Sequence, residues 1–332
     1  MVAHLIRATL AIGLGLAAAL VSSAARPEAA RTLTLSQSIE LRSVQGRLDH
    51  LSFDSEGSRL FVAALAADSL EVVDLRAATR ITRIEHLNEP QGVLYLAQGR
   101  RLFVAEGAGA RVQVFVDGKP AAAVAGLDDA DNLRFDPDTG RVYVGYGSAL
   151  AVLDPNATRT VGRFDLPGHP EGFELATTGP QIYVNVPSRR QIAVIDRRSG
   201  KIAATWDIGD AAENFPMALD EPQHRLFVAT RRPAMLLVYD TRSGRRTSQL
   251  PICADADDLF FDRQRGRLYV VCGEGAVDVV RQQDADHYSL IERVRTARGA
   301  RTGLLVPGLA TLFVAVPARR SAPAEIRAYK LE

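Results

Sequence analysis

A five-residue pattern recurs along the chain at intervals of about 40 residues. It begins as Arg-Leu-Phe-Val-Ala at residue 59 and returns, with conservative changes, from residues 101, 141, 181, 225, 267 and 311. The second residues of the seven copies are separated by 42, 40, 40, 44, 42 and 44 residues. Repetition at this period without a helical pattern is typical of propeller blades, in which each unit is a small sheet that must pack against its neighbours. Seven copies therefore predict seven blades.

Each unit holds four short segments of strand composition. In the first unit they cover residues 51–54, 59–64, 70–75 and 81–87, and turn residues separate them. The last unit begins at Gly303 and supplies only three strands before Glu332, whereas residues 32–41 offer a strand near the start of the chain. Without pairing between the two, the ring would leave exposed strand edges. We predict an all-β, seven-bladed β-propeller over residues 32–332, with four antiparallel strands per blade and the N-terminal strand completing the last blade.

The first 25 residues have the pattern of an export signal. Arg7 precedes an apolar run from Leu10 to Val21, and Ser23-Ala24-Ala25 fits the small-x-small cleavage pattern. The run is about 12 residues long, which is short of the roughly 20 that a spanning helix needs. We expect a signal peptide over 1–25, a short linker over 26–31, no transmembrane span, and a periplasmic or secreted protein.

The strands Arg-Leu-Phe-Val-Ala, Arg-Val-Tyr-Val-Gly and Arg-Leu-Tyr-Val-Val resemble YVTN-type repeats. Together with the export signal, they make the chain similar to the YncE-like group of exported bacterial seven-bladed propellers over about residues 32–332. The resemblance implies a secreted or periplasmic propeller and specifies no substrate. The Gly-His and Trp-Asp repeat of WD40 propellers is absent from the sequence.

Counting back from each repeat identifies the residues that enter the first strand of every blade. Six of the seven are polar, in the order Asp49, Gln91, Asp131, Glu171, Phe215, Asp257 and Arg301. The next positions are His50, Gly92, Asn132, Gly172, Pro216, Asp258 and Thr302. First strands line the axis of a propeller, so we expect these side chains to converge at an axial mouth on one face, here called the top face. The candidate ligand-binding residues are Asp49, His50, Gln91, Asp131, Asn132, Glu171, Asp257, Asp258 and Arg301.

Two interpretations of this mouth remain open. Asp and Asn side chains at strand starts often bond to nearby backbone N–H groups and need no ligand. Alternatively, oxygen donors from Asp131, Asn132, Glu171, Asp257 and Asp258 suit a Ca²⁺ or Mg²⁺ ion better than Zn²⁺. His50 and His169 could add a nitrogen ligand or a general base. Clustered carboxylates could also share a proton and titrate together.

Three arginine pairs occupy equivalent loops after the second strands of blades four, five and seven. They are Arg189 and Arg190, Arg231 and Arg232, and Arg319 and Arg320. Guanidinium groups suit phosphate and carboxylate, so the pairs predict a basic rim, unless they are simply solvated. Such a rim could hold a small anionic ligand, a nucleic-acid backbone or anionic lipid headgroups. Residues 26–332 carry 39 basic and 39 acidic side chains, which argues against a globally basic nucleic-acid binder.

The two cysteines predict a single disulfide. Cys253 precedes the first strand of blade six and Cys272 ends the second, and these positions are neighbours in an antiparallel pair. The bond would close a loop of about 20 residues and stabilise the fold by roughly 3 kcal/mol. A free pair that binds a soft metal or exchanges thiols is the alternative.

The sequence favours a binding function over catalysis. It contains neither a Gly-x-Ser-x-Gly nucleophile elbow nor a phosphate-binding loop. We expect a monomeric, non-catalytic exported module that binds a small anionic ligand or an exported protein partner on the top face. The alternative is a cation-dependent hydrolase or lactonase using Asp131, Asn132, Glu171 and Asp257. A third interpretation is a scaffold for another exported protein.

Overall fold

The computed structural model describes residues 1–2, 31–154, 156, 158–320 and 322–332. Most of the predicted signal peptide (3–25) and of the linker (26–30) lies outside the described residues. Within the described part, no helix is long and apolar enough to cross a membrane.

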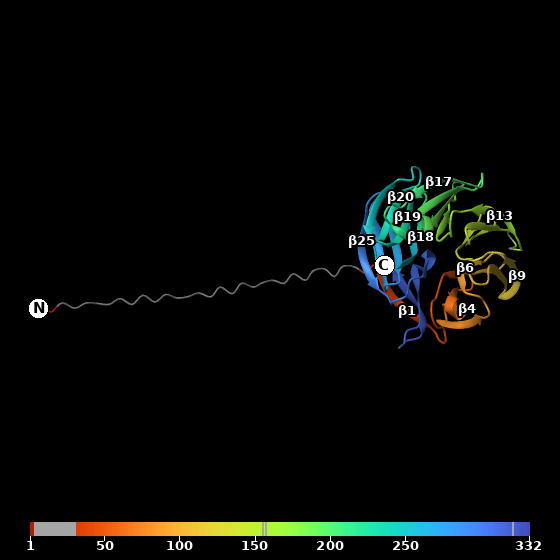
Figure 1. Cartoon of the computed structure of the whole chain (residues 1–332). Coiled ribbons are helices and arrows are strands. Elements are labelled where there is room, and N and C mark those ends of the chain that lie inside the picture. The colour runs from red at the N-terminus through yellow and green to blue at the C-terminus, as the bar shows by residue number, and fades with distance from the viewer. Residues whose placement is uncertain (3–30, 155, 157, 321) are drawn as a thin grey trace. The chain divides into compact units, whose positions relative to one another are not determined.

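Residues 31–332 form a seven-bladed β-propeller in which every blade is a four-stranded antiparallel sheet (Figure 1). Chain order and spatial order agree in six blades. The first three blades contain β2 (Leu51–Asp54), β3 (Arg59–Ala64), β4 (Ser69–Asp74) and β5 (Thr79–Ile84); β6 (Pro90–Leu96), β7 (Arg101–Glu106), β8 (Arg111–Val116) and β9 (Lys119–Ala125); and β10 (Leu133–Asp136), β11 (Arg141–Tyr146), β12 (Ala149–Leu153) and β13 (Thr160–Asp165).

The next three blades follow the same plan. They contain β14 (Phe173–Leu175), β15 (Gln181–Val186), β16 (Gln191–Asp196) and β17 (Lys201–Asp207); β18 (Ala212–Asp220), β19 (Arg225–Arg232), β20 (Ala234–Asp240) and β21 (Arg246–Pro251); and β22 (Ala256–Asp262), β23 (Arg267–Cys272), β24 (Ala276–Gln282) and β25 (Tyr288–Arg295). Three short 3-10 helices lie in loops, namely η1 (Leu65–Ala67), η2 (Pro187–Arg189) and η3 (Pro307–Leu309).

The seventh blade joins the two ends of the described propeller. Its strands are β26 (Gly303–Val306), β27 (Thr311–Val316), β28 (Ala324–Leu331) and β1 (Leu33–Leu41). β1 pairs with β28 from Leu33 opposite Leu331 to Leu41 opposite Ala324, with a bulge between Leu35 and Gln37. The predicted fold, strand number and ring closure are confirmed.

The repeated apolar pattern follows from burial on both faces of each blade. In β3, Leu60 and Val62 pack in a core shared with the seventh blade, whereas Phe61 and Ala63 pack in a core shared with the second. Successive side chains of a strand point to opposite faces, so a strand held between two sheets is apolar at consecutive positions. The same arrangement aims the start of each first strand at the axis.

Strand ends differ slightly from the prediction in the first blade. The third strand starts at Ser69 and the outer strand ends at Ile84 rather than continuing to Leu87. His86 has a positive φ of 64°, and the Leu87 N–H donates to the Asp68 carbonyl, so residues after Ile84 turn inward instead of extending the sheet.

Candidate functional site

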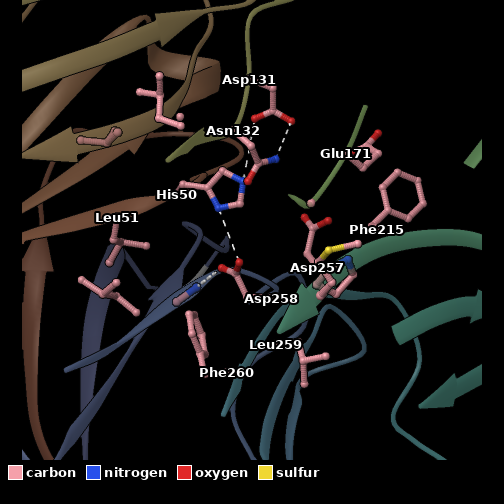
Figure 2. Close-up of a pocket in the computed structure, with 18 of the residues that line it drawn as sticks. His50, Leu51, Asp131, Asn132, Glu171, Phe215, Asp257, Asp258, Leu259 and Phe260 are labelled. Carbon is pink, nitrogen blue, oxygen red and sulfur yellow. Dashed lines mark hydrogen bonds and ion pairs between the residues drawn. The ribbon is translucent and has the colours of Figure 1, made fainter. Parts of the chain in front are cut away.

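The entrances of the first strands meet at the axis and enclose two cavities. An inner cavity of about 290 Å³ and an outer cavity of about 160 Å³ share five lining residues, Arg47, Asp131, Glu171, Phe215 and Asp257. These five residues are called the throat. Figure 2 shows His50, Asp131, Asn132, Glu171, Asp257 and Asp258 around a common space, although they come from four blades.

Two glycines in the predicted register permit the close approach of neighbouring blades. A Cβ on Gly92 would lie 2.1 Å from the Asp131 carbonyl oxygen, and a Cβ on Gly172 would lie 2.6 Å from that of Phe215. The Gly172 N–H donates to the same Phe215 oxygen at 3.0 Å. The entrances of these two blades are thus held against the backbone of the next blade, which helps to fix the positions of Asp131 and Phe215 in the throat.

A buried network of charges surrounds His50. Its Nε2 lies 3.8 Å from carboxylate oxygens of both Asp49 and Asp131, and its Nδ1 lies 3.5 Å from Asp258. Burial alone would lower the pKa of His50, but Asp258, Asp49 and Asp131 outweigh it and raise that pKa to about 10. His50 is therefore an imidazolium at neutral pH and has no free lone pair for a metal or for a proton.

Asp49 sits behind the throat rather than in its lining. It is 1% exposed, and Arg47 reaches it at 2.9 Å. Burial raises its pKa to about 7, against the opposing effect of His50 and Arg47. Asp49 therefore supports the positions of Arg47 and His50, the two groups that face the cavities.

The throat carboxylates differ in how well they are partnered. Asp257 pairs with Arg231 and lies 3.6 Å from Arg47. Asp131 accepts a hydrogen bond from Asn132 at 3.2 Å on one oxygen only. The other oxygen of Asp131 lies 3.8 Å from His50, and the second oxygen of Asp257 lies 3.6 Å from Arg47. Both oxygens are buried without a hydrogen bond to any described residue.

Glu171 is the least compensated member of the throat. Its carboxylate makes no hydrogen bond or ion pair with the part of the chain that the structure describes. Burial, together with the nearby charges of Asp131 and Asp257, raises its pKa to about 8 in spite of Arg231 and His50. Glu171 therefore readily holds a proton at neutral pH while the throat contains no external cation.

Phe215 replaces a polar side chain in blade five and creates a place for a cation. The guanidinium carbon of Arg231 lies 4.0 Å from the centre of the Phe215 ring. Arg231 also lies 3.3 Å from Asp255, pairs with Asp257, and donates to the Ala256 carbonyl at 3.0 Å. This arginine, expected on the rim, points into the outer cavity instead.

The outer cavity contains the remaining predicted mouth residues. Arg301 is held by Asp255 at 2.9 Å. Gln91 donates to Asp129 at 3.4 Å, and the Nδ1 of His169 lies 3.5 Å from Asp129. Asp255 and Asp129 thus anchor the polar groups at the surface end of the axis.

The other rim arginines lie in equivalent loops but in different environments. Arg232 pairs with Glu213 at 3.0 Å, and Arg319 lies 3.9 Å from Glu325. Arg189 donates to the Pro167 carbonyl at 2.9 Å. Arg190 and Arg320 are exposed, and neither side chain has a hydrogen bond or ion pair within the described residues. A continuous basic rim stays a prediction.

The mouth lacks the arrangement that a divalent cation requires. Among the described residues, no three His, Cys, Asp or Glu side chains are placed to hold a metal ion. The carboxylates of Asp257, Asp49 and Asp258 face Arg231, Arg47 and His50, so they are engaged with cationic side chains and do not form a coordination shell for Ca²⁺ or Mg²⁺. The residues present therefore do not fit the cation that the hydrolase interpretation needs.

Several site residues were missed by sequence reasoning. Arg47, Asp129 and Asp255 lie in loops just before the predicted register, where charged residues attract no attention. Arg134 and Glu174 lie three positions after Asp131 and Glu171, and their charged groups are 3.7 Å apart at the inner cavity. Burial raises the pKa of Glu174. The signal for both was available, since charged residues are unusual in first strands.

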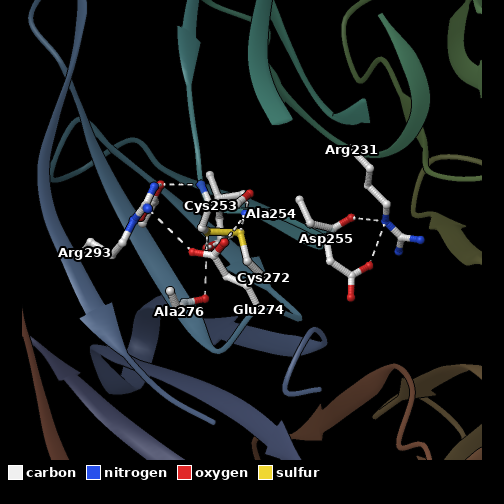
Figure 3. The surroundings of a disulfide bond; sticks show 11 residues. Arg231, Cys253, Ala254, Asp255, Cys272, Glu274, Ala276 and Arg293 are labelled. Atoms are coloured by element: carbon white, nitrogen blue, oxygen red, sulfur yellow. Dashed lines mark hydrogen bonds and ion pairs between the residues drawn. A yellow bond between two sulfur atoms is a disulfide. The ribbon is translucent and has the colours of Figure 1, made fainter. Parts of the chain in front are cut away.

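The predicted disulfide is confirmed and lies beside the site (Figure 3). Cys253 and Cys272 are fully buried, with Cα atoms 5.8 Å apart. The Cys253 N–H donates to Asp278 at 2.7 Å, and the next residue, Ala254, donates to Glu274 at 2.9 Å. The bond therefore fixes the start of the segment that carries Asp255, Asp257 and Asp258.

Comparison with known proteins supports the fold and goes no further. No protein-family model and no curated protein matches the sequence. The structure is similar to a chain of hydrazine synthase from Kuenenia stuttgartiensis, with a TM-score of 0.73 and 16% identity, over 87% of this chain and 98% of that one. It is also similar to a chain of a mitotic checkpoint complex, with a TM-score of 0.77 and 13% identity, over 97% and 99% of the two chains. The seven-bladed fold implied by the YVTN-type resemblance is confirmed, and membership of that group stays a prediction.

Proposed function

We propose that this protein is an exported, non-catalytic binding module that takes up a small molecule through the axial mouth of its top face. The observation that carries the proposal is the throat, where two cavities share buried carboxylate oxygens of Asp131 and Asp257 that have no hydrogen-bond partner among the described residues. Buried polar atoms in folded proteins are nearly always hydrogen-bonded. These two oxygens lie 3.8 Å from His50 and 3.6 Å from Arg47, beyond hydrogen-bond distance, so each can still accept a hydrogen bond from a group that enters the throat.

The composition of the cavity wall supports a small organic ligand. Besides the charged groups, the inner cavity is lined by apolar side chains such as Leu51, Val93, Met217 and Phe260. Ligand sites typically combine apolar walls with a few placed polar groups. A volume of about 290 Å³ is at the small end for such sites, which favours a ligand of amino-acid or monosaccharide size.

Ion pairs within the protein make the arginine rim a less suitable anion-binding site than the axial mouth. Three of the six arginines predicted to receive an anion already face carboxylates, namely Arg231, Arg232 and Arg319. The axial mouth remains the preferred site. Export is supported by the signal pattern at residues 1–25 and by the Cys253–Cys272 bond, because disulfides persist mainly outside the cytoplasm.

A cavity-filling variant tests this proposal. Leu304 lines the inner cavity, whereas Leu309 in the same blade is 41% exposed and lines neither axial cavity. We expect thermal-shift screening with amines, amino acids, monosaccharides and dicarboxylates to raise the Tm of the wild type and of Leu309→Trp, but not of Leu304→Trp. Binding that Leu304→Trp leaves intact, or no stabilisation of the wild type by any class, would contradict an axial binding site.

A further inference from the structure

The axial mouth contains more carboxylates than cationic side chains. Each arginine near the throat faces a carboxylate other than Glu171: Arg47 pairs with Asp49, Arg231 and Arg301 with Asp255, and Arg134 lies near Glu174. His50 is surrounded by Asp49, Asp131 and Asp258. The two cavities and their immediate support contain eight carboxylates, against four arginines and two histidines, His50 and His169. These carboxylates are Asp49, Asp129, Asp131, Glu171, Glu174, Asp255, Asp257 and Asp258.

The deficit of positive charge is located at the throat itself. Glu171 has no partner among the described residues, and Asp131 and Asp257 each keep one buried oxygen without a hydrogen bond. A group that enters the throat therefore meets acceptors on three sides. It also meets the Phe215 ring, whose attraction for a cation is already visible in the stacked guanidinium of Arg231.

Resting on the function proposed above, we propose that the ligand is a small organic amine whose ammonium group binds in the throat between Asp131, Glu171 and Asp257. An ammonium group has three N–H donors and no acceptor. These donors match the Glu171 carboxylate and the one oxygen each of Asp131 and Asp257 that accepts no hydrogen bond from a described residue. A metal ion does not match, because no three side chains in the described structure are placed to coordinate one.

The residues that line the inner cavity indicate what the rest of the ligand can be. Below the throat, the side chains of Leu51, Val93, Met217 and Phe260 line the inner cavity and can cover a short aliphatic or aromatic chain. The inner cavity also reaches Arg134 and Glu174, which can meet a polar group at the far end of the ligand. A four-carbon amine is therefore a suitable probe for the cavity.

The affinity for an amine should also depend on pH. Glu171 faces Asp131 and Asp257, which favour its protonated form, and Arg231, His50 and Arg47, which oppose it. An ammonium group binds best to the ionised carboxylate, so Glu171 must release its proton. Because its pKa is about 8, the affinity for an amine that stays mostly protonated over this range should rise from pH 6.5 to pH 8.5.

Calorimetric titration with matched four-carbon probes tests this inference. The probes are putrescine, neutral 1,4-butanediol and anionic succinate, and the proteins are wild type, Glu171→Gln, Asp131→Asn and Leu304→Trp. The control is Glu56→Gln, which makes the same chemical change at an exposed turn. We expect putrescine to bind the wild type and Glu56→Gln, and to bind Glu171→Gln and Asp131→Asn at least tenfold more weakly.

The pH dependence gives a second, independent readout. Between pH 6.5 and pH 8.5, the affinity of the wild type for putrescine should rise at least fivefold, and that of Glu171→Gln should change less than twofold. Equal binding by wild type and Glu171→Gln at both pH values would overturn the amine assignment.

The outcomes separate this inference from the proposed function. Binding of butanediol or succinate, but not putrescine, that Leu304→Trp abolishes would retain axial binding and reject the amine. Putrescine binding that is unaffected by Leu304→Trp would reject both. Failure of all three probes would reject the amine assignment alone, while the wider screen decides the axial site.

Discussion

At the scale of single residues, the axial mouth raises three pKa values in the same direction. The pKa of Asp49 rises to about 7 and that of Glu171 to about 8, in both cases because burial disfavours the charged carboxylate. The pKa of His50 rises to about 10 because nearby carboxylates outweigh its burial. All three groups hold their protons more tightly in the folded protein than in the unfolded chain.

This pattern predicts a protein that loses stability as the pH rises. The contribution of Asp49 is complete below pH 3.8 and is lost as the pH rises to about 7, and that of Glu171 is lost between pH 4.5 and about 8. His50 continues the loss between pH 6.5 and about 10. Glu221 and Asp240, whose pKa values fall to about 2, act oppositely and only below about pH 4.5. Thermal unfolding in low salt should give a lower Tm at pH 9 than at pH 5.

Glu171→Gln isolates one part of that dependence. The amide cannot ionise, so the variant should lose less Tm than the wild type between pH 5 and pH 9, by at least about 2 °C. Glu56→Gln, at an exposed turn, should follow the wild type. A Tm that rises over this range, or identical curves for Glu171→Gln and wild type, would show that the throat is not as desolvated as its geometry indicates.

At the scale of elements, the disulfide and the strand β1 hold the propeller by different means. The disulfide ties the entrance of β22 to the end of β23 within one blade. β1 instead supplies the outer strand of the seventh blade, which also contains the C-terminal strand β28. One therefore restrains a loop beside the site, and the other completes a sheet and its core.

Removal of the disulfide should cost stability by about 3 kcal/mol in the variant Cys253→Ala/Cys272→Ala. The bond closes a loop with a sequence separation of 19 residues, and its loss frees that loop mainly in the unfolded chain. Urea unfolding of the variant and of the oxidised wild type measures the difference. A midpoint within error of the oxidised wild type would show that the surrounding bonds to Asp278 and Glu274 suffice to fix the segment.

The strand β1 offers a matched pair of truncations. Ile39 is 1% exposed in the core of the first and seventh blades, whereas Leu35 in the same strand is 50% exposed. Ile39→Ala should lower the free energy of unfolding by about 2–4 kcal/mol, and Leu35→Ala by less than about 0.5 kcal/mol. Equal effects in urea unfolding would mean that β1 contributes through backbone pairing alone.

The sequence predicts the site residues on strands better than the orientation of side chains in loops. Strand repeats fix the register, so the positions of Asp131, Glu171 and Asp257 around the axis could be derived by counting. The direction of Arg231 could not, because it depends on contacts with Phe215 and with the next blade at Asp257. Loop side chains are oriented by tertiary neighbours that no local pattern records.

At the scale of the whole molecule, the propeller places groups from distant parts of the chain in one site. Asp49 precedes the first blade and Asp257 enters the sixth, yet both pair with Arg47. A site built in this way requires the closed ring, since it has no complete set of groups within any one blade. Loss of ring closure should therefore affect binding as well as stability.

The proposed export of the protein can be tested on the whole chain. Residues 1–25 have the pattern of a cleavable signal, and cleavage after Ala25 would leave a chain that begins at Arg26. Expressed with this segment in a Gram-negative host, the protein should appear in the periplasmic fraction with the mass of residues 26–332 and an oxidised Cys253–Cys272 pair. A version that starts at Arg26 behind an initiating Met should stay in the cytoplasm with free thiols, because that compartment keeps cysteines reduced.

The free energy of unfolding of this reduced protein should be lower by roughly 3 kcal/mol, as in the cysteine-free variant, and oxidation should restore it. Retention of residues 1–25 on a cytoplasmic product, with the disulfide formed there, would contradict both the export signal and the link between compartment and stability.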